Sequence, residues 1–181
     1  MGLSLSAGNG VRKSLSKSPE FNSACESAFN YCRSLTQDAF QGVLLYQLNT
    51  ASQHLHHLLS ISQSESHPVI LIHKWVSTPP SRSQVDSALR RLNINASSSS
   101  SSSDTTTTLL GPIQFKDWAV ELYTDAVVSA ATKALMLRVP VGVAGIAGLG
   151  AATRFRKEFV ATAVGAYSLG VVVSIFLGLS R

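Results

Sequence analysis

The chain of 181 residues carries a net charge of +5, with 15 Lys and Arg against 10 Asp and Glu. This length suits one modest domain. The basic residues are scattered, whereas a nucleic-acid groove needs a dense basic stripe with aromatic side chains. Composition and charge therefore argue against nucleic-acid binding and are more typical of a protein that contacts an anionic membrane surface.

The cysteines are Cys25 and Cys32. On a helix they would share a face but lie ~10 Å apart along the axis, too far for an internal disulfide. We therefore expect two buried, reduced thiols in a reducing compartment.

Residues 1–20 are rich in Ser and contain no acidic residue before Glu20, which predicts a flexible basic arm. The first six residues, MGLSLS, fit the N-myristoylation pattern with Gly2 as the acceptor. The same composition is typical of an organelle transit peptide, whereas the apolar core of a secretory signal is not seen. Acylation, transit and an unmodified arm therefore remain open.

Residues 21–95 have the pattern of amphipathic helices. Apolar side chains recur at helical spacing from Phe21 to about Ser62, and Gly42 in the middle leaves one long helix or two shorter ones open. The opposite face carries unusually few charges, so we expect part of this region to bind a partner. The candidate partner-binding residues are Phe40, Leu44, Leu48 and Leu55.

Two shorter elements complete this region. Residues 68–76 form an apolar run that fits either a strand or a buried helical turn, and no second strand stands out to pair with it. After Pro79 and Pro80, Ser83 is expected to cap a short helix, with Asp86 three residues later.

A low-complexity Ser/Thr linker is predicted at residues 96–112, because this composition cannot bury a core. Residues 113–138 then have the pattern of an amphipathic juxtamembrane helix. Its acidic residues come early and its basic residues late, the order that the helix dipole favours. We expect this helix either to lie near the membrane surface or to pack on the first helices.

The C-terminal part of the chain carries the strongest signal. Residues 159–180 contain no ionisable group except Tyr167, and at ~1.5 Å per residue a helix of this length crosses the ~30 Å core of a bilayer. The Gly-rich apolar segment 139–153 is short alone, but with the preceding residues it would form the first span of a hairpin. Charge placement favours a single C-terminal anchor, since all basic flanks then stay on one side. The hairpin is the alternative.

Small residues recur every four positions in the terminal segment. They are Thr162, Ala166, Gly170, Ser174 and Gly178. Such a ridge lets two membrane helices approach closely, so we expect it to be a packing face. Gly145, Gly148 and Ala152 are a candidate complementary surface, and Tyr167 needs a partner for its hydroxyl group.

No catalytic, cofactor-binding or metal site is predicted. The stretch GLGAAT at residues 148–153 is half of a dinucleotide-binding fingerprint, without the strand and following chain of a Rossmann unit. His54 and His57 share a helical face but lack a third ligand nearby, so hydrogen-bonded surface histidines are the better interpretation.

Together these patterns predict an all-α protein of amphipathic helices, a linker and a C-terminal transmembrane helix. This order resembles the tail-anchored membrane proteins as a class. The resemblance implies an N-terminal region in the cytosol. Because the span has basic flanks, it also implies a mitochondrial or plastid outer membrane rather than the endoplasmic reticulum.

The predicted function is a non-enzymatic membrane adaptor or assembly protein. Its partners would be the lipid bilayer, another membrane protein or a second copy through the C-terminal helix, and a soluble protein through residues 21–62. The alternative is a small accessory subunit of an organelle inner-membrane complex, inserted as a two-helix hairpin. A membrane-bound enzyme is a third class, for which the sequence offers no convincing acid–base pair.

Overall fold

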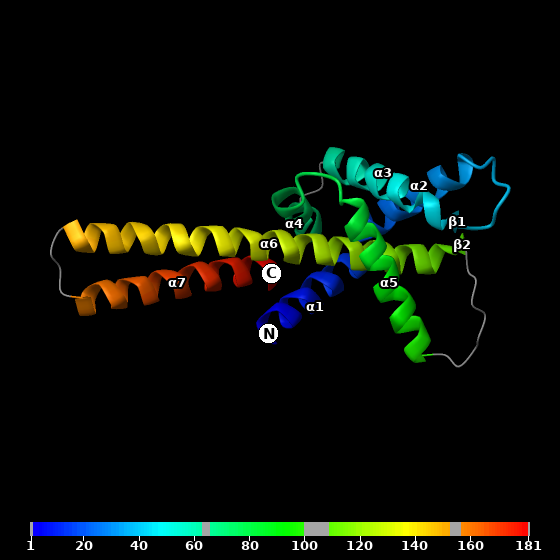
Figure 1. The fold of residues 1–181 in the computed structure, drawn as a ribbon. Helices are drawn as coiled ribbons and strands as arrows, with labels where there is room; N and C mark the ends of the chain where they lie inside the picture. Colours follow the sequence, from blue (N-terminus) through cyan, green and yellow to red (C-terminus); the bar gives the residue numbers. More distant parts are fainter. Residues whose placement is uncertain (1, 63–65, 100–108, 153–156, 181) are drawn as a thin grey trace. The chain divides into compact units, whose positions relative to one another are not determined.

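The computed structural model describes residues 2–62, 66–99, 109–152 and 157–180. These residues are helical apart from short connections and one pair of two-residue strands (Figure 1). The predicted all-α class is confirmed. The chain divides into two compact units, Met1–Val127 (unit 1) and Val128–Arg181 (unit 2), and the long helix α6 (Pro112–Ala152) contributes residues to both.

The N-terminal segment is a helix, so the prediction of a flexible arm at residues 1–20 is wrong. Helix α1 spans Gly2–Lys17. Its Ala7, Val11 and Leu15 are spaced four residues apart and are buried, with 7%, 0% and 1% of their surface exposed. The core contact of this narrow stripe holds α1 in place, because intrinsic propensity rarely stabilises so short a helix in water.

The apolar stripe from Phe21 to Ser62 forms two helices, α2 (Pro19–Ser34) and α3 (Leu48–Ile61), which pack along each other. Ser18 caps α2 by accepting a hydrogen bond from the backbone N–H of Phe21 at 3.2 Å. The turn after α2 contains Gln37 and Asp38 with φ of 51° and 56°. This left-handed backbone ends the helix although the apolar spacing continues past it.

The connection between α2 and α3 contains strand β1 (Val43–Leu44) and the 3₁₀ turn η1 (Leu45–Gln47). Strand β1 pairs antiparallel with β2 (Leu109–Leu110), with Val43 opposite Leu110. Gly42 is required here, since a Cβ at this position would lie 2.6 Å from the carbonyl oxygen of Leu110. The buried Gln47 accepts from the N–H of Leu44 and donates to the carbonyl of Cys32, both at 3.0 Å, which ties the connection to α2.

The short apolar run is a helix, α4 (His67–Trp75), which settles the choice between strand and helical turn. Helix α5 spans Arg82–Ser99. The residue before it, Ser81, forms a hydrogen bond between its N–H and the side chain of Gln84 at 2.9 Å. Ser81 therefore occupies the cap position, and Ser83, the predicted cap, lies inside the helix.

The predicted linker at residues 96–112 is only partly described. Helix α5 continues to Ser99, strand β2 occupies Leu109–Leu110, and α6 begins at Pro112. These three elements contradict the prediction at both ends of the linker. Its middle, residues 100–108, lies outside the described residues.

The predicted helix 113–138 and segment 139–153 belong to one helix, α6, which continues through Pro140. Its first turns supply the centre of the core of unit 1. Phe115, Trp118, Leu122, Tyr123 and Val127 are all at most 1% exposed. The ring of Phe115 contacts Phe29 with centroids 5.5 Å apart, and Tyr123 contacts Phe21 at 5.8 Å. The prediction that this helix packs on the first helices is confirmed.

A network of ion pairs joins α1, α5 and α6. Glu121 on α6 lies 3.0 Å from Arg12 on α1 and 3.5 Å from Arg91 on α5, and Arg91 also lies 2.7 Å from Asp125. The hydrogen bond to Asp125 raises the pKa of Arg91. The Glu121 side chain is only 13% exposed, so its carboxylate has lost part of its hydration. The positive charges of the two arginines compensate for this loss.

The burial of α3 generates a stability prediction. Replacing Leu55, which is fully buried, by Ala should reduce the free energy of unfolding by about 2–5 kcal/mol through lost burial and a residual cavity. Ile61→Ala on the same helix, at a side chain that is 61% exposed, should change it by less than about 0.5 kcal/mol. Urea unfolding of the full chain in mild detergent, followed by tryptophan fluorescence, measures both. Equal losses would contradict the described core.

Candidate functional site

Two helices are long and apolar enough to cross a membrane. These segments are Pro112–Gly148 of α6 and Val160–Leu179 of α7 (Lys157–Ser180). In unit 2 their large apolar side chains point outward. Those more than half exposed are Met136, Leu137, Val141, Leu169, Val173 and Leu177. Such a continuous apolar surface is unusual for a water-exposed protein and is typical of an interaction with lipid or protein.

The apolar helix of a soluble core is the usual alternative for such segments, and it does not fit here. A core helix buries most of its side chains. In the most apolar stretch of each candidate helix, only 17% of the α6 residues and 6% of the α7 residues are buried. Unit 2 therefore presents apolar helices without a core to enclose them.

The two helices of unit 2 contact each other through Tyr167 of α7. Its hydroxyl group donates to the backbone carbonyl of Arg138 on α6 at 3.3 Å. Its ring lies directly against Gly142, where any Cβ would overlap the ring. Figure 1 shows α7 running beside the second part of α6 in the opposite direction. The backbone carbonyl of Arg138 is therefore the hydrogen-bond partner that the sequence predicted the Tyr167 hydroxyl group to need.

Gly142 explains how Tyr167 reaches that carbonyl. A helical side chain leans toward the N-terminus and covers the preceding turn. With no side chain at position 142, the carbonyl of Arg138, four residues earlier, is open to a donor from a neighbouring helix. The pair of Gly142 and Tyr167 therefore fixes one point of contact between α6 and α7.

The predicted ridge of small residues faces away from this contact. Thr162, Ala166, Gly170 and Ser174 are exposed, and Gly178 is partly exposed. Nothing lies within 4 Å of a Cβ built on Gly170, Gly178, Gly145 or Gly148. Gly145 and Gly148 therefore do not contact the ridge within this chain, and the side chain of Ala152 lies outside the described residues. Packing of the ridge against another chain stays a prediction.

The four candidate partner-binding residues divide into two groups. Leu48 and Leu55 are 1% and 0% exposed, so the prediction is wrong for them: their stripe faces the core. Phe40 is 42% exposed, and Leu44 is partly exposed in β1. Three further side chains, which were not among the predicted candidates, are also exposed: Leu35 by 52%, Leu45 by 36% and Tyr46 by 74%. We call Leu35, Phe40, Leu45 and Tyr46 the connection patch, because all lie between α2 and α3.

Two histidines of unit 1 are engaged in packing contacts. His54 stacks on Tyr31 with ring centroids 4.0 Å apart, and a ring nitrogen of His56 lies 2.9 Å from the carbonyl oxygen of Val76. Burial, with a smaller effect of His57, lowers the pKa of His54. No group of three or more His, Cys, Asp or Glu side chains is placed to hold a metal within residues 2–62, 66–99, 109–152 and 157–180.

Both cysteines are buried free thiols. Burial raises the pKa of Cys25 to about 12, against a smaller lowering by Lys116, and raises that of Cys32 to about 11. At neutral pH these groups remain protonated, which makes them poor nucleophiles. Gly2, the candidate acceptor for myristate, is the first residue of α1.

The contact between α6 and α7 generates a second prediction. Gly142→Val should displace the Tyr167 ring and destabilise the helix pair, whereas Gly145→Val, three residues further on in open space, should leave it intact. Tyr167→Phe removes one hydrogen bond between membrane helices, which is worth about 0.6 kcal/mol on average.

The measurement is the denaturation of each variant in mixed micelles with increasing dodecyl sulfate, followed by circular dichroism. The midpoint should fall for Gly142→Val and fall slightly for Tyr167→Phe. A midpoint lowered equally by Gly145→Val would show that the loss comes from the valine and not from the contact.

Comparison with known proteins gives no relative of this chain: no protein-family model, no curated protein and no solved structure matches it. The function has to be inferred from the residues and contacts described above.

Proposed function

We propose that the protein is a non-enzymatic membrane adaptor or assembly subunit. Unit 2 is embedded in the bilayer as a two-helix hairpin, and unit 1 is a helical module that binds a partner. The observation that supports this best is the outward-facing apolar surface of both helices of unit 2. In lipid this surface needs no further cover, and the helical backbone satisfies its own amides.

The dimensions of the helices support the hairpin. Helix α7 has 24 residues, which at ~1.5 Å per residue gives about 36 Å against the ~30 Å of a bilayer core. The part of α6 in unit 2, from Val128 to Ala152, has a similar length. Its Lys133 lies toward the end of the pair opposite the turn. Arg138 lies near the middle of this stretch, level with Tyr167, so its long side chain has to extend its charged end toward the interface.

The hairpin explains more of the structure than the single anchor does. A single span through α7 would leave the second part of α6, with Val141 74% exposed, facing water. It would also give Tyr167 no hydroxyl partner in lipid. The two-helix alternative therefore replaces the single C-terminal anchor in our proposal. A mitochondrial or plastid membrane stays the proposed location, on the basic residues that flank the spans.

The chemistry of unit 1 supports a binding role over a catalytic one. Both thiols are protonated in the core, and His54 and His56 are held by ring and backbone contacts. The connection patch instead exposes four large apolar side chains on one short stretch of chain. An exposed apolar group of this size is typical of a protein–protein contact, where aromatic residues contribute most of the binding free energy.

The topology of the chain tests the membrane proposal. The protein expressed with a tag at each terminus should remain in the membrane pellet after alkaline carbonate washing. In sealed membranes a protease should remove both tags from the same side, because a hairpin returns the chain to the side it came from. Release by carbonate would exclude an embedded protein, and tags on opposite sides would establish the single span.

Substitutions in the connection patch test the adaptor proposal. Tyr46→Ser and Phe40→Ser together should abolish co-purification of a stoichiometric partner without lowering the stability of unit 1, because both side chains are exposed. Ile70→Ser, at an exposed residue of α4 outside the patch, is the matched control. Mass spectrometry of crosslinked eluates makes the comparison. A partner retained by the patch variant, or lost equally from the control, would place the interface elsewhere.

A further inference from the structure

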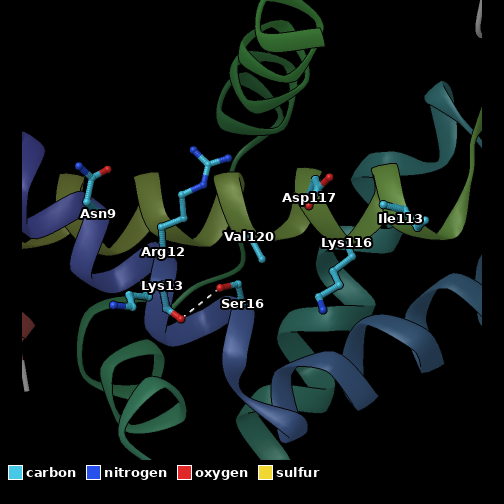
Figure 2. Close-up of a pocket in the computed structure, with 8 residues that line it drawn as sticks. All are labelled: Asn9, Arg12, Lys13, Ser16, Ile113, Lys116, Asp117 and Val120. Atoms are coloured by element: carbon cyan, nitrogen blue, oxygen red, sulfur yellow. Dashed lines mark hydrogen bonds between the residues drawn. The ribbon is translucent and has the colours of Figure 1, made fainter. Parts of the chain in front are cut away.

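A pocket of about 500 Å³ lies between α1 and the first part of α6. Figure 2 shows the side chains that line it, which come from both helices. They are Asn9, Arg12, Lys13, Ser16, Ile113, Lys116, Asp117 and Val120. Three of the eight are cations and one is an anion, in a chain whose ionisable side chains otherwise occur mostly as scattered surface residues.

The cations of the pocket are not equivalent. Arg12 is already paired with Glu121 at 3.0 Å and belongs to the network that joins the helices. Among the described residues, no carboxylate pairs with Lys13 or Lys116. Asp117 is the one carboxylate in the lining, and Figure 2 shows it extending from the side of α6 opposite Lys116. Lys13 and Lys116 are therefore the charges free to bind a ligand.

Lys116 is held close to the protein. It is only partly exposed, and its ammonium group is near enough to the buried thiol of Cys25 to act on the pKa of that thiol. In Figure 2, Lys13 and Lys116 lie on opposite sides of Ser16, and the exposed Lys13 side chain extends away from Lys116. The Ser16 hydroxyl group already donates to the carbonyl of Lys13 at 3.1 Å, so it offers its oxygen, while the Asn9 amide offers two N–H donors.

The pocket also has an apolar edge. Ile113 lies one turn before Lys116 on α6 and is 77% exposed, and Val120 is buried at the base of the lining. A ligand that satisfies both the ammonium groups and Ile113 needs an anionic group with an apolar part attached to it. A phosphate monoester has that chemistry, because its oxygens accept charge-assisted hydrogen bonds from lysine.

We propose that this pocket binds a phosphate monoester. Lys116 binds the phosphate group together with Lys13, whose exposed side chain is free to turn toward it. Asn9 donates to the phosphate, and Ile113 contacts the apolar part of the molecule. The ester is either the headgroup of a phospholipid or a soluble metabolite, and the phosphate chemistry is common to both. The site lies entirely within unit 1, so it does not depend on whether unit 2 enters a bilayer.

Calorimetric titration of the full chain in a maltoside detergent tests the proposal. The probes are inorganic phosphate, dioctanoyl phosphatidic acid and, as a lipid without a free monoester, dioctanoyl phosphatidylcholine. The wild type should bind phosphatidic acid, inorganic phosphate or both, and should not bind phosphatidylcholine. Binding of inorganic phosphate alone assigns the site to a soluble ligand, and a clear preference for phosphatidic acid assigns it to a lipid.

Matched variants distinguish binding of the ligand in the pocket from nonspecific attraction of an anion to a basic protein. Lys13→Gln with Lys116→Gln should weaken binding by about tenfold or more, since each removes a charge-assisted hydrogen bond. Lys17→Gln with Lys74→Gln removes the same charge outside the pocket and should leave affinity unchanged. Lys13→Arg with Lys116→Arg keeps both charges, should retain binding, and guards against loss through misfolding.

Two results would overturn the proposal. The first is a wild-type protein that binds neither phosphate nor phosphatidic acid at millimolar concentration. The second is an equal loss of affinity in the control pair, Lys17→Gln with Lys74→Gln, which would show that net charge and not the pocket attracts the ligand. Circular dichroism of each variant confirms that the compared proteins are equally helical.

Discussion

The fold of unit 1 depends on the burial of one face of α6. Trp118 and Tyr123 are fully buried there, and the aromatic rings of α2 pack against Tyr123 and Phe115. Helices as short as α1 and α4 are marginal on their own, so their stability comes from packing. Helix α1 packs on α2, α4 and α6, and α4 packs on α1, α2 and α3. The ion pairs of Glu121 with Arg12 and Arg91 then fix the orientation of α1 and α5 on the same helix.

The two units differ in the exposure of the apolar side chains on α6, the helix that they share. In unit 1 the apolar residues of α6 are covered by neighbouring helices, which is the response of a chain to water. In unit 2 the apolar residues of α6 and α7 remain outside, and the polar contact is placed inside, where Tyr167 reaches the carbonyl of Arg138. In lipid the opposite arrangement is favoured from that in water: apolar side chains need not be buried, and a hydroxyl group needs a hydrogen-bond partner within the protein.

The sequence predicted the features that depend on local pattern. Helical spacing identified α2 and α3, and the uncharged terminal run identified α7. Three features could not be predicted because they depend on contacts between distant residues. Helix α1 depends on a core in which Val11 is buried, and the end of α2 depends on the left-handed backbone at Gln37 and Asp38. The pairing of α6 with α7 depends on the contact between Gly142 and Tyr167.

The candidate site shows the same limit more sharply. An apolar stripe on a helix does not say whether it meets the protein's own core or another molecule. Leu48 and Leu55 were therefore assigned to a partner although they are buried, while Tyr46, in an irregular connection without periodicity, went unnoticed. The pocket residues Lys13 and Lys116 are far apart in the chain and become neighbours only through the packing of α1 on α6.

Helix α6, which supplies the centre of the core of unit 1, is also the last element of that unit in chain order, and this has a consequence for synthesis. The ribosome delivers α1 to α5 before Trp118 exists, so the emerging chain holds several apolar stripes with nothing to bury them. The residues that follow, in the second part of α6 and in α7, expose further apolar side chains. Until α6 has left the exit tunnel, a nascent chain of this design therefore exposes apolar surface that is prone to aggregate.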